Sequence, residues 1–582
     1  MEKTGSSRKE NTVLFFTAFV CLGLICLYVF AGHKLFFATN DDVMLKAILT
    51  GDITGSPDAH LIYVMYPLGW LLKSLYTINA KVPWYDGFIT VLHLAVYFLV
   101  MFRTGRIFAS RKIGERILLT VLAGVVIFTI DFPYLIWHQY TSLAATVAAV
   151  SLYFYLTAEK REEGLHAGEQ IVIGLFLLLS LWLRKQVFIM ALPLLGLAFL
   201  LRLSGKFKAK RLILPGVLAV LIALSFLAEK KAYSSDEWQE FLAYNTYRTD
   251  VYDYYLLPPY EENVQEYTNL GIDEKDMFPL AEWDLGLFPG YQKENMKGMA
   301  ELSGNAWKNL HYQKWEIKHT LKNVLNLILH QDIQPIGWIL TAVTVLSIPG
   351  LFILKKKKAA FMVILSVLYE GAFVTYFTFR GRFPERVSYG LYLLEFIFIA
   401  GVWIHCLTNV GQTEESKRKN ILPAVSIALL AVMAVVLVIR IVGFGKQYKQ
   451  YVNKTDEWNT ANTYFASHPE NVYYVKTSSF ASYGEEMFKE STYEGNNFLR
   501  IGSWIMGSPL YEKKVSALSL SGESSKALYK DANTYYVQDA VVGTTWLETF
   551  YADESPVITE EETVPLGEQK SMTVVSLKTE GN

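Results

Sequence analysis

The sequence predicts a mostly α-helical, polytopic membrane protein with about eleven transmembrane helices and a small extracytoplasmic α+β domain at its C-terminus. Composition is the first reason: 52% of the 582 residues are hydrophobic and only 19% are charged, which exceeds what a soluble globular core needs. The second reason is that long apolar runs recur over residues 1–442, whereas residues 443–582 contain short strand-like stretches. A net charge of −1 argues against nucleic acid as a partner.

The first apolar run, Val13–Gly32, predicts the orientation of the chain. Lys3, Arg8 and Lys9 precede it, and positively charged segments next to a span stay in the cytoplasm. The run is too long for a signal-peptide core, so we expect it to remain as an anchor. The N-terminus is therefore predicted to be cytoplasmic, and the segment after Gly32 to emerge on the outer face.

Ten further runs are read as spans. They lie near residues 84–102, 117–136, 139–156, 171–183, 187–201, 212–228, 334–354, 359–379, 387–407 and 421–442. One apolar segment, Leu61–Ile78, is left out of this count because including it would place the next basic loop, 103–116, outside. It is predicted to be an amphipathic helix on the outer surface, within a first outer loop over 33–83.

The segment 171–201 is predicted to be a hairpin rather than one long helix. The basic loop over 202–211 must be cytoplasmic, and this requires two crossings. Arg184 and Lys185 then form the outward tip of the hairpin. The complete count ends with the C-terminal region on the outer side.

Two extramembrane regions are expected in addition to the first outer loop. Residues 229–333 form a long outer loop that is rich in tyrosine and tryptophan, and a connection of that length is rarely passive. Residues 443–582 are predicted to form the soluble extracytoplasmic domain, with helical sequence near 455–467. Its expected strands are Val472–Lys476, Thr534–Gln538, Val541–Thr545 and Met572–Leu577.

The triplet Asn40-Asp41-Asp42 directly follows the first span and precedes a predicted helix over 43–49. Asn and Asp are favoured helix N-cap residues, so one of the three is expected to cap this helix. Two adjacent acids exceed what a cap requires, and both lie at the bilayer edge. We therefore predict that Asp41 or Asp42 is a catalytic base, with capping as the alternative.

Basic residues on the outer side form the second candidate group. Short outer loops are normally poor in Lys and Arg, so the exceptions are informative. They are Arg184, Lys185 and, between the ninth and tenth spans, Arg380, Arg382 and Arg386. Guanidinium groups match phosphate oxygens, so these residues are predicted to bind a lipid-linked phosphate. Pairing with lipid headgroups or with nearby acids such as Glu385 is the alternative.

Three weaker candidates for substrate binding are also predicted on the outer side: His60, Asp131 and His138. A purely structural role is the alternative for each. Glu370 and Glu395 fall within predicted spans, where an acid is costly and either pairs between helices or serves a function. No HExxH motif, P-loop or regular metal-ligand spacing occurs.

With the acid pair after the first span, juxtamembrane helices over 43–78, about eleven spans and an outer C-terminal domain, the layout resembles the GT-C class of membrane glycosyltransferases. This class includes protein O-mannosyltransferases, the aminoarabinose transferase of lipid A and oligosaccharyltransferase catalytic subunits. Asn-Asp-Asp, Gly51-Asp52 through Gly55-Ser56-Pro57 and the string from Arg380 to Arg386 are similar to uncharacterised bacterial membrane-protein families near this class.

The resemblance implies transfer of a sugar from a polyprenyl-phosphate donor on the outer face, with inversion at the anomeric carbon. The acceptor would be an envelope glycan, a lipid or a protein. Asp41 matches the first acid of the Asp-Glu motif of the mannosyltransferases, so it is the first choice as general base. Asp42 stands where that motif has Glu, which leaves the division of roles between the two open. No cofactor is expected, although the two acids leave a divalent cation open.

Two other functions are compatible with the sequence. A polysaccharide polymerase or ligase would share the spans and the basic outer loop, but would need no acid at the end of the first span. A transporter or flippase for lipid-linked sugars would place its key charges near the midplane, as Glu370 and Glu395 are placed.

Overall fold

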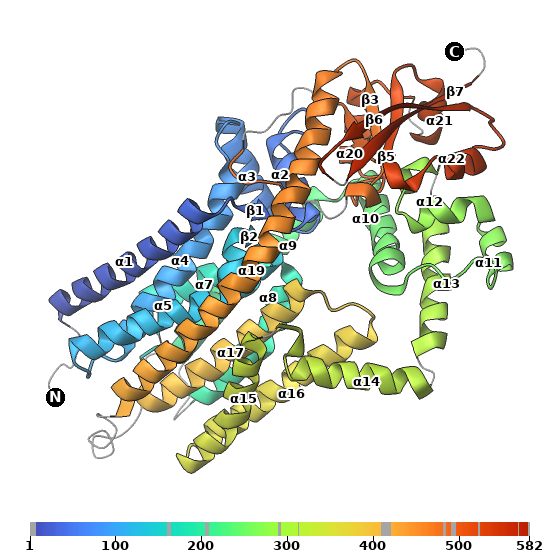
Figure 1. The fold of residues 1–582 in the computed structure, drawn as a ribbon. Coiled ribbons are helices and arrows are strands. Elements are labelled where there is room, and N and C mark those ends of the chain that lie inside the picture. The colour runs from blue at the N-terminus through green and yellow to red at the C-terminus, as the bar shows by residue number, and fades with distance from the viewer. Residues whose placement is uncertain are drawn as a thin grey trace.

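The computed structural model in Figure 1 describes most of the chain. The described residues are 7–159, 165–203, 209–288, 293–311, 314–333, 335–408, 421–480, 485–489, 496–521, 524–568 and 570–579.

Ten of the described helices are long and apolar enough to cross a membrane, and a shorter apolar helix, α7 (Ala167–Leu183), accompanies them. Together they correspond to the eleven predicted spans. The ten are α1 (Arg8–Gly32), α4 (Trp84–Ile107), α5 (Ile113–Ile136), α6 (Tyr140–Thr157), α8 (Lys185–Arg202), α9 (Ile213–Ala232), α15 (Ile336–Ile353), α16 (Lys357–Phe379), α17 (Glu385–Thr408) and α19 (Ile421–Ser467). A short 3-10 turn, η1 (Ala209–Leu212), precedes α9.

The predicted hairpin over 171–201 is present as α7 and α8. Arg184 alone separates the two helices, and its extended backbone (φ −157°) reverses the chain. Pro193 lies inside α8 without ending it.

Helix α6 is the centre of the bundle. It packs against α4, α7, α8 and α17, and 94% of the residues in its 18-residue apolar stretch are buried. Small residues such as Ala145 and Ala148 allow these close approaches. By contrast, only 6% of the residues in the 18-residue apolar stretch of α9 and 11% of those in the apolar stretch of α19 are buried. Both helices therefore leave apolar faces for lipid.

Two short helices follow α1 at the end of the bundle that carries the C-terminal domain, which we call the domain end (Figure 1). They are α2 (Asn40–Thr50) and α3 (Tyr66–Ile78). Helix α3 is not among the candidate spans, and it exposes Trp70 and Ile78 on one face, as an amphipathic surface helix does. Strand β1 (Phe36–Phe37) pairs in parallel with β2 (Trp137–His138), which places the start of α2 beside the start of α6.

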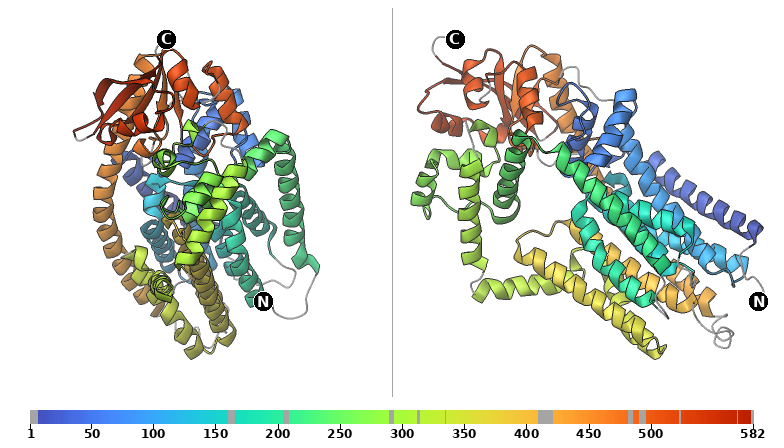
Figure 2. Two further views of the ribbon diagram at one scale, coloured as in Figure 1. Left: turned by 90° about the vertical axis from the view of Figure 1, so that its right-hand side faces the viewer. Right: turned by 180° about the vertical axis from the view of Figure 1, so that it is seen from behind.

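The predicted long loop over 229–333 folds into a series of helices (Figure 2). Residues 274–288 lie against the C-terminal domain, whereas residues 314–328 pack against α16 of the bundle. The elements of this loop are α10 (Asp236–Thr249), the π-helical η2 (Asp250–Tyr255), α11 (Val264–Asn269), η3 (Glu274–Asp276), α12 (Met277–Ala281), η4 (Leu285–Leu287), α13 (Lys293–His311), α14 (Lys314–Ile328) and η5 (Gln331–Ile333). Many of its aromatic rings are used in packing, as when Tyr252 contacts Trp283.

The C-terminal domain (residues 468–579) is built on a five-stranded sheet of order β4-β3-β5-β7-β6. Strands β4, β3 and β5 run parallel, and β7 and β6 are antiparallel additions. The strands are β3 (Val472–Val475), β4 (Phe498–Arg500), β5 (Thr534–Asp539), β6 (Val557–Pro565) and β7 (Ser571–Lys578). The other elements are η6 (Ser478–Phe480), α20 (Pro509–Ala517), α21 (Ser524–Lys530), η7 (Ala540–Val542) and α22 (Thr545–Phe550).

Three of the four predicted strands are confirmed, as β3, β5 and β7. The prediction of a strand over Val541–Thr545 is wrong, because Gly543 adopts φ +69° and the segment becomes η7 and the start of α22. Strand β6 is polar and largely exposed, so it lacks the apolar alternation that identifies a strand in sequence.

Helix α19 connects the bundle to the C-terminal domain without a break. The predicted domain boundary at 443 falls inside this helix, and the sheet begins only at Val472. The predicted helical stretch near 455–467 is its last part.

Candidate functional site

The acid pair lies in the first turn of α2, at the domain end of the bundle (Figure 1). Thr39 precedes the helix, so Asn40, Asp41 and Asp42 are its first three residues. The side chain of Asp42 is fully buried. Its Oδ1 accepts hydrogen bonds from the hydroxyl of Tyr85 (3.1 Å) and the backbone N–H of Tyr140 (3.0 Å), and its Oδ2 accepts one from the hydroxyl of Thr39 (2.9 Å).

These bonds make Asp42 a structural link between α2, α4 and the start of α6. Burial, together with the charge of neighbouring Asp41, raises the pKa of Asp42 to about 7, although its three hydrogen bonds oppose the shift. The prediction that one of the three residues caps this helix is wrong, because Thr39 is the N-cap residue and no side chain makes a capping hydrogen bond there. The Asp42 side chain instead joins separate elements.

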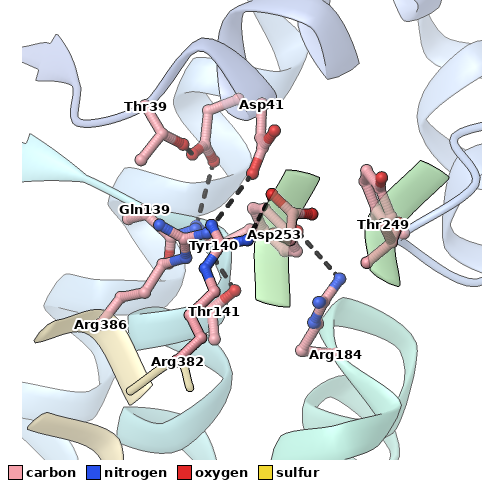
Figure 3. Close-up of polar contacts among 12 residues, drawn as sticks. Thr39, Asp41, Gln139, Tyr140, Thr141, Arg184, Thr249, Asp253, Arg382 and Arg386 are labelled. Atoms are coloured by element: carbon pink, nitrogen blue, oxygen red, sulfur yellow. Dashed lines mark hydrogen bonds and ion pairs between the residues drawn. The ribbon is translucent and has the colours of Figure 1, made fainter. Parts of the chain in front are cut away.

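Asp41 faces a different direction. Its side chain is 17% exposed, and its carboxylate lies 4.0 Å from a guanidinium nitrogen of Arg386, near the start of α17. Figure 3 shows Asp41 and Arg386 pointing toward each other. A partly exposed carboxylate is accessible to a substrate, which a general base requires.

Arg382 and Arg184 complete this group in Figure 3. Arg382 forms an ion pair with Asp253 of η2. Arg184 donates a hydrogen bond to the hydroxyl of Tyr140 (3.0 Å), and its guanidinium group lies over the rings of Tyr63 and Tyr140. The structure thus brings together Asp41 and Asp42 of α2, Arg184 of the α7–α8 turn, Arg382 of the segment before α17 and Arg386 of the first turn of α17.

Two of the predicted phosphate-binding residues contact other parts of the chain. Arg380 pairs with Asp250 (3.3 Å) and lies over the ring of Tyr254. Lys185 lies 4.0 Å from Glu229 at the end of α9. In these contacts the positive charge of each side chain faces a carboxylate of the 229–333 segment.

The three weaker candidates are held by structural contacts. His60 is hydrogen-bonded to Asp58 (2.6 Å) and to the carbonyl of Ala232 (3.2 Å), and it stacks on Trp238. Its hydrogen bonds hold the pKa of Asp58 at about 2 despite burial. His60 therefore joins the first connecting segment to α9 and α10.

His138 and Asp131 lie inside the bundle. His138 is buried in β2 beside the ring of His93. Asp131 is buried in α5, where it accepts from the hydroxyl of Tyr97 (3.0 Å) and also contacts His93 and Tyr389. This network connects α4, α5 and α17.

Several residues around the acid pair were not singled out from the sequence. Tyr85 and Tyr140 hold Asp42, and Asp253 pairs with Arg382. Lys46 of α2 forms a buried ion pair with Asp86 of α4 (3.2 Å). Charged residues within apolar sequence, such as Asp86 after Pro83-Trp84-Tyr85, are the signal that identifies this last pair.

The adjacent carboxylates do not fit a metal site. Both oxygens of Asp42 already accept hydrogen bonds, and the two side chains face different partners. Within the part of the chain that the structure describes, no group of three or more His, Cys, Asp or Glu side chains is arranged to hold a metal ion.

A second buried acidic group lies deeper in the bundle. Glu370 of α16 is 3.0 Å from His330, and Glu395 of α17 accepts from Ser366 (3.3 Å). All three titratable side chains are almost fully buried. Glu370 and Glu395 are hydrogen-bonded to each other between α16 and α17, as the pairing alternative predicted, and the functional alternative for these two acids stays open.

Comparisons with known proteins give one similarity. No protein-family model matches the chain, and no curated protein matches it. Among solved structures, ArnT from Cupriavidus metallidurans bound to undecaprenyl phosphate aligns over 98% of this chain and 98% of its own, at 11% sequence identity and a TM-score of 0.40.

Proposed function

We propose that the protein is an inverting membrane glycosyltransferase of the GT-C type that moves a sugar from a polyprenyl-phosphate donor to an envelope acceptor. The observation that carries this proposal is the placement of Asp41 beside Arg386, with Arg184 and Arg382 in the same group. An accessible carboxylate next to several guanidinium groups at one end of a helical bundle combines a base with an anion site.

In the proposed reaction, the Asp41 carboxylate takes the proton of an acceptor hydroxyl. The acceptor oxygen attacks the sugar C1 from the side opposite the phosphate, so the new C–O bond forms as the bond to phosphate breaks. The polyprenyl phosphate leaves with the bonding electrons and its negative charge. Fixed cations stabilise that charge, so no general acid is needed.

Arg184 is the strongest candidate for the phosphate contact. Its contacts are a tyrosine hydroxyl and two aromatic rings, which orient the guanidinium group without neutralising it. Arg386 would exchange its 4.0 Å contact with Asp41 for phosphate when the donor binds. Asp42 is assigned the role of a positioning residue that fixes α2 against Tyr140.

A lipid-linked-sugar transporter is the second candidate, and a specific observation favours it. His330, Glu370 and Glu395 form a buried titratable group within the bundle, of the kind that transporters use for protons. A transporter would not depend on the Asp41 carboxylate. A polysaccharide polymerase or ligase would likewise not depend on the Asp41 carboxylate.

The test is the glycan composition of the cell envelope in a null strain that carries wild type, Asp41→Asn or Asp236→Asn at matched protein levels. Asp236 is the matched control because it is exposed in the first turn of α10. We expect Asp41→Asn to lower transfer by roughly 10²–10⁴-fold and the control to have no effect. Full restoration of the glycan by Asp41→Asn would refute the transferase proposal.

The orientation belongs to the same proposal, with the N-terminus in the cytoplasm and the C-terminal domain outside. Val541 in that domain is 89% exposed. A cysteine placed there should react with a membrane-impermeant reagent in intact cells. Protection until the cells are lysed would reverse the assigned topology.

A further inference from the structure

A cavity of about 160 Å³ lies between α2 and the C-terminal domain. Its walls come from the α2 residues Val43 and Met44, from the end of α19 and from the region of β4 and α20. A smaller cavity of about 20 Å³ shares Met44 and Arg500 with it and reaches Asn40, the residue before Asp41. The two cavities together extend from the C-terminal domain to the first turn of α2.

Helix geometry relates this cavity to the acid pair. With 3.6 residues per turn, Asn40, Met44 and Ala47 share one face of α2. They line the cavities. Asp41 lies on the adjacent side of the helix, where it meets Arg386, and Asp42 lies nearly opposite the cavity. The cavity therefore lies on one side of Asp41, and Arg386 lies on another side.

The lining combines aromatic rings with hydrogen-bonding side chains. Trp458, Phe498 and Tyr511 supply rings, and Asn462 and Asn496 supply amides. Asn496 Oδ1 is buried, and no hydrogen-bond partner for it is found among the described residues. A buried acceptor that faces a cavity is costly unless a ligand or water donates to it.

Charged groups of both signs also line the cavity. Asp52 and Glu485 are acidic, and Arg500 and Lys514 are basic. Burial raises the pKa of Glu485 to about 7 and lowers that of Lys514 to about 8. Because the signs balance, the cavity favours a neutral, polyhydroxylated ligand over a phosphate or another strong anion.

The size agrees with this chemistry. A volume of 160 Å³ accommodates on the order of ten water-sized groups, which is comparable to one sugar ring. Sugar rings present apolar C–H faces to aromatic side chains and hydroxyls to amides and carboxylates. The lining offers both kinds of contact.

We infer that this cavity binds a sugar ring of the acceptor, so that the acceptor is a saccharide rather than a protein or a simple lipid. The inference rests on the proposed transferase function. The donor phosphate would occupy the arginine side of Asp41, and the acceptor glycan would extend from the Asn40 end of the cavities to the C-terminal domain.

The test uses the full-length protein in nanodiscs on an array of short saccharides with neutral hexoses, N-acetylhexosamines and uronic acids. Calorimetry with the best saccharide then compares wild type with Asn462→Leu, which removes a lining amide, and Ala466→Trp, which fills the cavity from an exposed position. Asn453→Leu is the matched control, because Asn453 is an exposed asparagine on the same helix.

We expect wild type to bind a neutral saccharide, and both cavity variants to bind it at least roughly tenfold more weakly, which corresponds to about 1.4 kcal/mol. Asn453→Leu should bind as wild type does. Absence of saccharide binding, equal binding by all variants, or binding to a peptide or lipid vesicle instead would overturn the inference.

Asp41→Asn separates this inference from the proposed function. It should retain saccharide binding and lose transfer. If it retains both, the transferase proposal fails while the binding site stands. If wild type transfers a sugar but the cavity variants leave both binding and the KM for acceptor unchanged, the acceptor site lies elsewhere.

Discussion

At the scale of single residues, the structure gives two adjacent aspartates different surroundings. Asp42 is buried and accepts three hydrogen bonds, whereas Asp41 is partly exposed and faces one cation. The difference arises because successive residues of a helix point about 100° apart. One carboxylate can therefore fix the helix while its neighbour remains available to a substrate.

The pKa of Asp42 predicts how stability depends on pH. A folded-state pKa of about 7, raised from the usual 3.8, means that the folded protein binds this proton more tightly than the unfolded chain does. The stabilisation is complete below pH 4 and is lost as the pH rises toward 7. In thermal unfolding scans, Asp42→Asn should flatten the decline of Tm between these values. An unchanged pH profile in the variant would show that other groups cause the decline.

Arg184 is predicted to act through its planar, bidentate geometry. Arg184→Lys keeps the charge but loses the fork and the ring contacts, so the KM for the lipid donor should rise by roughly tenfold or more. Steady-state kinetics with varied donor measures this. Lys81→Ala, an exposed lysine after α3, is the control. A change in kcat alone would assign Arg184 to another step.

At the scale of helices, α6 and α17 pack closely against each other at the centre of the bundle. A Cβ added to Gly401 would lie 2.6 Å from Leu156 Cδ1 and 2.9 Å from its Cβ. Glycine at this position lets the two backbones approach closely. Inside a bilayer the hydrophobic effect does not drive helices together, so such close packing is what stabilises their association.

Two glycine substitutions should therefore have opposite effects. Gly401→Ala should destabilise the protein by about 1–3 kcal/mol through overpacking. Gly443→Ala, in α19, meets open space and should stabilise the helix by up to about 1 kcal/mol. Thermal unfolding in detergent compares the two. Equal effects would show that helix propensity, not the α6–α17 contact, dominates.

At the scale of the whole molecule, the C-terminal domain is fastened to the 229–333 segment as well as to α19. Lys476 of the domain is buried and forms an ion pair with Asp284 (2.6 Å), which also accepts from the hydroxyl of Tyr536 (3.1 Å). Gly286 donates a backbone hydrogen bond to Ile501 (2.7 Å) nearby. These contacts hold the domain over α2.

Breaking the buried pair should loosen this arrangement. Asp284→Ala leaves the buried Lys476 with only its longer contact to the partly exposed Glu282 (3.6 Å), and removing one partner of a buried pair costs up to about 3–5 kcal/mol. Limited proteolysis should then cut between the domain and the bundle sooner than in wild type. Asp553→Ala removes an ion pair with Lys275 in which Asp553 is 79% exposed, so it should have little effect. Equal protease resistance of all three proteins would contradict this role.

The sequence by itself determined the class and the span pattern of this protein. Hydropathy is a local property, so the helices, the Arg184 hairpin and three of the strands could be read from short windows. The Asp41–Asp42 pair was likewise visible as two acids at the end of a span. Strand β6 was not predicted from the sequence because an exposed edge strand carries no apolar periodicity.

Only the tertiary structure decided what each candidate residue contacts. Arg386 lies beside Asp41 and Arg380 beside Asp250, although both arginines occur in the same short string. Asp131 and His138 proved to be packed inside the bundle. The reason is physical: ion pairs, burial and cavities depend on segments hundreds of residues apart along the chain, and no local pattern encodes those distances.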